Sequence, residues 1–441
     1  MRDIALTAVI FGILPFVLRR PHWGVLLWTW IGLMNPHRLT WGFAFNFPFA
    51  VVAGLTTLVA VLISREPKRI PWEPPVVVLL LLIFWMTVST VFSLYPSEAW
   101  EQWQKVMKIQ LFIFVTLIVM QSRERITALV WVSTLSLAFY GIKGGIFTLS
   151  GGGSGMVLGP DGGFIAGNTE ISLALTMTIP MLRWLQIQSD SRWLRLGLGV
   201  AMVLVAIAVL GSYSRGGFLA ILGMAGFLWL KSRNKTLVAL ILAALVPLTL
   251  MVMPDQWFQR MATIQTYDSD SSATGRINAW GFAVNLARSR PLTGGGFQTF
   301  QPEAFQKWAP NPEDFHDAHS IWFQILGEQG FAGLALYLMM WFFTWRTGNA
   351  IIRDCGDREP LRWASGLAAM LQVSIIGYWV GGSFLGLAYW DFPYVLLALL
   401  VLTRIVVLNQ VMTEVPATAT VADGAATVSR APESRPTSAS G

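Results

Sequence analysis

The chain has little charge, a single cysteine and few histidines. Only 12% of its 441 residues are charged, whereas a soluble globular protein carries about 25%, so a solvated globular architecture is excluded for most of the chain. The lone cysteine, Cys355, excludes a disulfide framework and any cysteine-based metal site. The formal net charge of +7 does not indicate nucleic-acid binding, because most basic residues lie in short segments between apolar runs.

Long apolar runs occupy most of the sequence instead. Hydrophobic residues make up 54% of the chain, and the runs have the length of about 17 to 25 residues that a helix needs to cross a bilayer. The sequence therefore predicts an all-α polytopic membrane protein with about 12 transmembrane helices. The first run is not a cleavable signal, because it ends at Arg19 and Arg20 and further runs follow it. The predicted spans lie near residues 4–18, 23–35, 47–64, 73–94, 104–121, 126–148, 169–187, 193–212, 215–231, 236–253, 320–345, 364–386 and 389–408.

The first two runs are short and are separated by the residues RRPH at 19–22. They predict two thin spans, a re-entrant pair or one broken element.

The basic residues indicate which side of the membrane each connecting segment faces. Alternate segments carry nearly all of them, and the segments between are almost bare, so the basic set is predicted to be cytoplasmic. The predicted organisation is a helical bundle at 1–253, an extracytoplasmic loop region with short helices at 254–319, further transmembrane helices at 320–408 and a disordered cytoplasmic tail at 409–441. The basic residues of the cytoplasmic set are Arg19, Arg20, Arg65, Lys68, Arg69, Arg123, Arg125, Arg192, Arg195, Lys231, Arg233, Lys235, Arg346, Arg353, Arg358 and Arg362.

Several arginines break this charge rule by lying on the extracytoplasmic side. Arg215 follows Tyr213 in GSYSRGGFLA at the outer end of a run, and a guanidinium with five fixed donors suits bidentate contact with a phosphate. Arg276, Arg288 and Arg290 lie in TGRINAW and ARSRPLTGGGF. A helix between Arg276 and Arg288 would place both on roughly one face. The alternative is an ordinary solvated loop domain, or for Arg215 a side chain that reaches the headgroups.

The proline and glycines that follow Arg290 are helix breakers. Pro291 and the glycines at 294–296 are therefore predicted to end the helix that carries Arg276 and Arg288.

Two histidines lie three residues apart in NPEDFHDAHSIWFQILGEQG, at residues 311–330. One interpretation is a metal site, although no HExxH pattern accompanies His316 and His319. The Asp268–Asp270 pair has a spacing that can hold a cation, but such a pair is more often a solvated turn. The favoured interpretation is that His319 begins a helix, stays neutral because of the helix dipole and acts as a general base. His316 is then a supporting or surface residue.

The side of the membrane on which the site is predicted to lie restricts which activated donors can reach it. ATP and nucleotide sugars are cytoplasmic, so an extracytoplasmic site of arginines and a histidine requires an activated donor that has already crossed the membrane. A glycan on a polyprenyl pyrophosphate fits, because arginines stabilise the charge of a departing pyrophosphate.

Four motifs, in this order and spacing, resemble the O-antigen ligase and polymerase superfamily: SRGG at 214–217, GRINAW at 275–280, PLTGGGFQTF at 291–300 and AHSIWFQILGEQGFAGL at 318–334. The N-terminal 50 residues are similar to a branch of O-glycosylation ligases. The resemblance implies an inverting, metal-independent glycosyltransferase of the GT-C type, without a cofactor. It would transfer O-antigen from undecaprenyl pyrophosphate to the lipid A–core oligosaccharide, among the lipids of the bacterial inner membrane, at its periplasmic face.

The same resemblance implies roles for individual residues. Arg215 and Arg276 match the family's essential arginines, with Arg288 as the alternative to Arg276, and His319 matches its essential histidine. Ser320 stands where many relatives have asparagine. Arg288, Arg290, His316 and Tyr213 are expected to contact substrate.

Three other functions remain open. An O-antigen polymerase would share these motifs but use a lipid-linked acceptor, and a protein O-oligosaccharyltransferase would use a serine or threonine. A flippase for the lipid-linked glycan would also have about a dozen spans, but it should carry ionisable residues near the membrane midplane. Here the spans are nearly free of charge and the polar residues gather near one face, which favours the enzyme.

Overall fold

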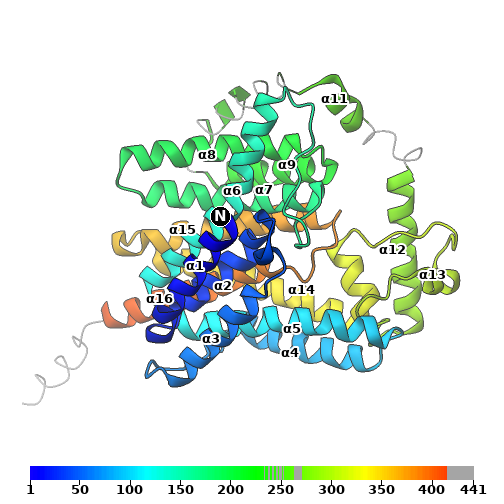
Figure 1. Cartoon of the computed structure of the whole chain (residues 1–441), viewed down its shortest axis with the longest axis horizontal. Coiled ribbons are helices and arrows are strands. Elements are labelled where there is room, and N and C mark those ends of the chain that lie inside the picture. Colours follow the sequence, from blue (N-terminus) through cyan, green and yellow to red (C-terminus); the bar gives the residue numbers. More distant parts are fainter. Residues whose placement is uncertain are drawn as a thin grey trace, which may run out of the picture.

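Helices make up all the regular secondary structure in the part of the chain that the computed structural model describes, which is residues 1–232, 234–236, 239–240, 243–244, 247, 251, 253–262 and 271–414. The elements are α1 (Arg2–Arg19), α2 (His22–Met34), η1 (Pro36–Leu39), η2 (Phe43–Phe45), α3 (Phe49–Ile63), α4 (Pro74–Val91), α5 (Pro96–Val119), α6 (Arg123–Ser150), α7 (Asn168–Gln188), α8 (Arg192–Gly211), α9 (Arg215–Lys231), α11 (Asp255–Ala262), α12 (Ser271–Ser289), α13 (Pro302–Trp308), α14 (Ile321–Cys355), η4 (Glu359–Leu361), α15 (Arg362–Gly382) and α16 (Asp391–Glu414). Figure 1 shows α12 and α13 at one end of the bundle.

The polytopic helical architecture predicted from the apolar runs is confirmed. Among the described residues, six helices are long and apolar enough to cross a membrane: α4, α6, α8, α14, α15 (counted from η4) and α16. The total of about 12 spans remains a prediction, and most of the span at 236–253 lies outside the described residues. Helix α16 continues to Glu414, past the predicted start of the tail at 409, and residues 415–441 also lie outside them.

The first two apolar runs form two separate helices. Arg20 has an extended backbone between them, and Pro21 cannot donate a hydrogen bond to continue α1. Both helices pack against α3.

Helix α16 lies at the centre of the bundle. Every side chain from 392 to 403 is buried, and the helix packs against α2, α4, α5, α6, α14 and α15. A helix that is apolar on all sides is expected in a protein core or in a membrane.

The basic connecting segments meet at one end of the bundle, which we call the basic end (segments 64–73, 119–125, 184–195 and 358–363). The amide of Gln121 donates to the carbonyl of Arg69 over 2.7 Å. The guanidinium of Arg123 lies over the ring of Trp363 at 5.1 Å, and the indole of Trp184 donates to the carbonyl of Trp363 over 3.0 Å. These contacts bring together segments that the charge pattern predicted to share one side.

The segments poor in lysine and arginine meet at the other end of the helices, which we call the site end (segments 92–95, 151–167, 212–214, 290–320 and 383–390). Here the amide nitrogen of Leu94 donates to the carbonyl of Gly295 over 2.8 Å. The side chain of Asn168 donates to the carbonyl of Ser212 over 2.9 Å. Because α4 runs from residue 74 to residue 91, it connects the basic end to the site end.

A break in α14 is closed by the turn that follows α12. Gly330 has φ 69° and ψ −172°, which interrupts the helix. The turn at 291–296 supplies the missing hydrogen bonds: Gly295 and Gly296 donate to the carbonyls at 327 and 328 over 2.8 and 2.9 Å, and the amide at 331 donates to the carbonyl of Pro291 over 2.8 Å. We call residues 291–296 together with 327–331 the glycine clasp.

The clasp requires glycine on both sides. A Cβ atom on Gly294 would lie 2.5 Å from the carbonyl oxygen of Gly327, and one on Gly330 would lie 2.4 Å from that of Leu292. The backbone of Gly330 is also in a region that is essentially restricted to glycine. Two backbone segments therefore approach more closely than any side chain would allow.

We expect Gly330→Ala to lower the thermal unfolding temperature of the purified protein, because the backbone conformation alone costs roughly 1–3 kcal/mol and the new methyl group strikes a backbone carbonyl. Gly197→Ala in α8 is the matched control, since nothing lies within 4 Å of its Cβ position, and alanine favours a helix over glycine. Differential scanning fluorimetry in detergent makes the comparison. Equal unfolding temperatures for Gly330→Ala and wild type would contradict the role of the clasp.

Candidate functional site

Arg276 and Arg288 lie on the helix that the sequence predicted. Helix α12 runs from Ser271 to Ser289 and ends before Pro291, as expected from the proline and the glycines. Arg276 is half-buried, whereas Arg288 in the last turn is exposed. The two arginines therefore differ in their surroundings, and Arg276 is the one that reaches the histidine segment.

Two side chains of α12 hold the segment that carries the histidines. The amide of Asn278 donates to the carbonyls of Asn311 and Asp314, over 2.7 Å each, and its oxygen accepts from the amide nitrogen of Asn311 over 2.8 Å. The indole of Trp280 donates to the carbonyl of Ala318 over 2.8 Å and stacks on Phe323 at 4.8 Å. Sequence reasoning missed these positioning roles, although both residues lie in the GRINAW motif. A polar and an aromatic residue on the same helix as Arg276 was the available signal.

The sequence predicts that His319 begins α14, but in the structure His319 precedes this helix. The helix starts at Ile321 with Ser320 at its N-cap, and His319 has a φ of 38°. Left-handed backbone at a non-glycine residue is uncommon and is often found at functional sites.

The pKa of His319 is lowered from its ordinary value, first by burial and then by the positive charge of Arg276, while Asp317 acts in the opposite direction. The lowered pKa agrees in direction with the predicted neutral imidazole. Its causes are burial and the charge of Arg276, and not the predicted helix dipole. Ser320 is fully buried, and within the described residues its hydroxyl has no hydrogen-bond partner.

His316 lies between its own loop and α12. Its Nδ1 atom is 3.0 Å from a carboxylate oxygen of Asp314, close enough for an ion pair but without hydrogen-bond geometry. Gly275 allows this position, since a Cβ atom there would lie 2.4 Å from the imidazole. Among the described residues, no group of three or more histidine, cysteine, aspartate or glutamate side chains is placed to hold a metal ion. Asp268 and Asp270 lie outside those residues.

Arg215 is the first residue of α9. The hydroxyl of Ser214 caps the helix by accepting from the amide nitrogen of Gly217 over 3.0 Å. Gly216 packs beside Thr169 and Phe384. Residues 170 and 386, close to these two in the chain, line the cavity beside His319. The start of α9 therefore lies next to the wall of that cavity.

Two predicted substrate-binding residues use their polar atoms within the fold. Tyr213, with a φ of 57°, donates its hydroxyl to the carbonyl of Gly153 over 2.5 Å. Arg290 donates through Nε to the carbonyl of Gly294 over 2.6 Å and through a terminal nitrogen to the carbonyl of Phe92. Both residues fix loops at the site end. That they also contact substrate remains a prediction.

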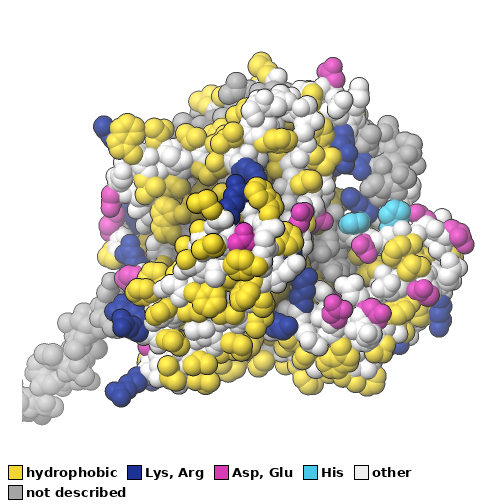
Figure 2. Space-filling view, in the orientation of Figure 1, with side chains coloured by type: hydrophobic (Ala, Val, Ile, Leu, Met, Phe, Trp, Pro, Cys, Tyr) yellow, Lys and Arg dark blue, Asp and Glu magenta, His cyan; other side chains and the backbone are white. Residues whose placement is uncertain are grey.

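A polar cavity of about 280 Å³ opens beside His319. The positive charge of Arg276 acts on both Glu170, in the first turn of α7, and His319. Figure 2 shows histidine side chains near basic ones at the end of the molecule where α12 and α13 lie. The cavity is lined by Gln102, Lys105, Phe164, Glu170, Gln298, Phe300, Asp317, Ala318, His319, Gln324, Glu328, Gly386 and Tyr389.

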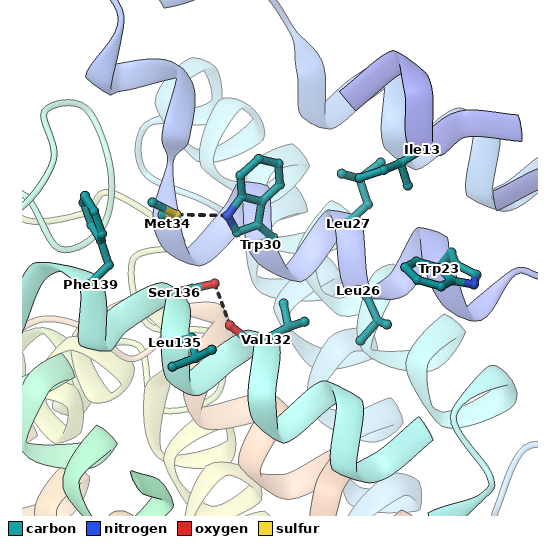
Figure 3. A pocket seen from close by; sticks show the side chains of 10 residues that line it. All are labelled: Ile13, Trp23, Leu26, Leu27, Trp30, Met34, Val132, Leu135, Ser136 and Phe139. Carbon is teal, nitrogen blue, oxygen red and sulfur yellow. Dashed lines mark hydrogen bonds between the residues drawn. The ribbon is translucent and has the colours of Figure 1, made fainter. Parts of the chain in front are cut away.

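A larger groove of about 400 Å³ lies between α1, α2 and α6, and it is almost entirely apolar (Figure 3). Two of its polar side-chain groups are satisfied locally: the indole of Trp30 donates to the sulfur of Met34 over 2.9 Å, and the hydroxyl of Ser136 donates to the carbonyl of Val132 over 2.6 Å. This groove offers contact to an apolar chain but no group for catalysis. The candidate active site is therefore the polar cavity.

Comparisons with protein families divide the chain into two parts. Residues 1–190 match a family of unknown function, DUF5935, and residues 200–338 match the O-antigen ligase family. A search of curated proteins finds no match. The second match contains Arg215, Arg276 and His319 together with the clasp and the residues that position the histidine segment. The match over residues 200–338 supports the resemblance to the O-antigen ligase superfamily that the motifs predicted.

Proposed function

We propose that the protein is an inverting, metal-independent glycosyltransferase. It transfers O-antigen from undecaprenyl pyrophosphate to a sugar hydroxyl of the lipid A–core oligosaccharide at the periplasmic face of the bacterial inner membrane. The observation that carries this proposal is the pairing of a half-buried His319, whose pKa is lowered, with Arg276 beside a polar cavity. A neutral imidazole accepts a proton, and a guanidinium binds a phosphate.

The reaction follows from these two groups. The acceptor hydroxyl gives its proton to His319 as its oxygen attacks the anomeric carbon of the donor sugar. The bond from that carbon to the pyrophosphate oxygen breaks, and undecaprenyl pyrophosphate leaves from the opposite face, which inverts the configuration. Arg276 and Arg215 stabilise the negative charge that develops on the leaving group.

The arrangement of the loops supports a periplasmic site. The basic segments meet at the end of the bundle opposite the cavity, in contacts such as the 2.7 Å ion pair between Arg125 and Glu66. Under the positive-inside rule the basic end is cytoplasmic, and the cavity then faces the periplasm, where lipid-linked glycans are available. The same rule places the C-terminal end of α16 in the cytoplasm.

We expect His319→Ala and Arg215→Ala to reduce O-antigen attachment about 100-fold or more, because each removes a group that acts in the transition state. The measurement is the O-antigen ladder on lipopolysaccharide from a strain that lacks its own ligase. Arg362→Ala is the control, since Arg362 lies at the basic end and its side chain is 66% exposed. Membrane levels of each variant are compared by immunoblot.

The wild-type result decides which acceptor is used. A restored ladder supports the ligase. Growth of a lipid-linked polymer indicates a polymerase, a glycosylated protein indicates a protein O-oligosaccharyltransferase, and full activity of His319→Ala would exclude the general-base mechanism.

The acidic limb of the pH–rate profile should report the pKa of His319, because activity is lost as the imidazole becomes protonated with falling pH. Arg276→Gln removes a charge that lowers this pKa, so the limb should move to higher pH. Asp317→Asn removes a charge that raises it, so the limb should move to lower pH. Initial rates of the purified variants between pH 4 and 8 provide the test, with the position of the limb and not its height as the readout. Shifts in the same direction would show that the limb belongs to another group.

A further inference from the structure

The polar cavity beside His319 has the composition of a site for an uncharged sugar. Three amide side chains, Gln102, Gln298 and Gln324, line it together with three carboxylates and aromatic rings. Amides both donate and accept hydrogen bonds and carboxylates accept them, as sugar hydroxyls require, and aromatic rings provide apolar contact for a sugar ring. The volume of about 280 Å³ is close to the lower end of ligand pockets, about 300–1,000 Å³. The cavity is therefore large enough for one sugar residue.

Glu328 is a buried acidic residue in the wall of the cavity. Glu328 is 2% exposed, and one of its carboxylate oxygens accepts from the backbone nitrogen of Gln298 over 3.0 Å. The hydroxyl of Tyr389 lies near the same carboxylate, but within the described residues Oε2 makes no hydrogen bond of ordinary geometry.

The charged residues of the cavity indicate which part of the substrates binds there. The lining contains the carboxylates of Glu170, Asp317 and Glu328 and a single lysine. The ammonium of that lysine, Lys105, lies over the ring of Phe164 at 4.2 Å. A pyrophosphate is bound by guanidinium groups such as those of Arg276 and Arg215, and neither arginine lines the cavity. The cavity is therefore left to an uncharged polyhydroxyl group.

Both parts of the chain contribute to this cavity. Gln102, Lys105, Phe164 and Glu170 come from the segment at 1–190, whose family has no known function, whereas Asp317, Ala318 and His319 come from the O-antigen ligase segment. The N-terminal segment thus reaches the reacting histidine.

We propose that this cavity is the acceptor subsite, that it binds the uncharged sugar residue bearing the attacking hydroxyl, and that the N-terminal segment determines acceptor specificity through Gln102 and Glu170. This inference rests on the proposed function. It assigns the carboxylates to substrate binding, where they orient the acceptor with its hydroxyl towards His319.

The test is steady-state kinetics of the purified full-length protein, with undecaprenyl-pyrophosphate-linked oligosaccharide as donor and lipid A–core as acceptor. Glu170→Gln and Gln102→Ala should each raise the KM for the acceptor about tenfold, the effect of one lost hydrogen bond, and leave the KM for the donor unchanged. Glu328→Gln should do the same if it folds. Glu313→Gln is the matched control, since Glu313 is exposed in the histidine segment and does not line the cavity. Unfolding temperatures verify that each variant is folded.

The outcomes separate this inference from the proposed function. A raised KM for the donor alone would mean that the cavity holds the donor sugar, and unchanged values for both substrates would mean that its polar groups are structural. Either result overturns the acceptor subsite while the enzyme remains a glycosyltransferase. If the wild-type protein consumes no lipid-linked donor, the proposed function itself fails and the acceptor subsite fails with it.

Discussion

The site depends on a break in the long apolar helix α14 and on the backbone hydrogen bonds that close this break. A chain in a bilayer must satisfy its backbone hydrogen bonds internally, so the break in α14 at Gly330 requires partners from elsewhere in the protein. The glycine clasp supplies them through backbone atoms, which demands an approach that only glycines permit. The short first part of α14 is thereby fixed against the turn after α12. His319, just before its start, and Glu328, near its end, then both line one cavity.

The electrostatics of the cavity follow from this geometry. The positive charge of Arg276 acts on both His319 and Glu170. One guanidinium therefore influences both the candidate base and an acidic residue of the cavity wall. Because burial also lowers the pKa of His319, the imidazole stays neutral without a carboxylate partner of its own. This differs from a histidine oriented by an aspartate, since here α12 orients the segment through Asn278 and Trp280, which bind its backbone carbonyls.

The sequence was sufficient to predict most of the long helices, because apolar runs and scarce charged residues are local features. Helix α9 occupies the predicted residues 215–231, and α12 ends where Pro291 and the glycines indicate. The first residues of α5 were missed because they are polar, and hydropathy does not detect a helix that extends beyond an apolar run. The positions of Asn278, Trp280 and Glu328 depend on which segments meet in three dimensions, which no local pattern records. The left-handed backbone of His319 has the same origin.

Gln329 shows why the two parts of the chain form one site. Its side-chain oxygen accepts from the hydroxyl of Ser89, its amide donates to the hydroxyl of Tyr389 over 3.2 Å, and its backbone carbonyl accepts from the indole of Trp85 over 3.1 Å. A glutamate could not donate, and a leucine could do neither, so the position needs an uncharged group that is both donor and acceptor. Ser89 and Trp85 belong to the N-terminal segment, and Tyr389 lies beyond the O-antigen ligase match. One residue inside the clasp therefore ties all three stretches of chain together, and a cavity lined by all three forms only when they fold together.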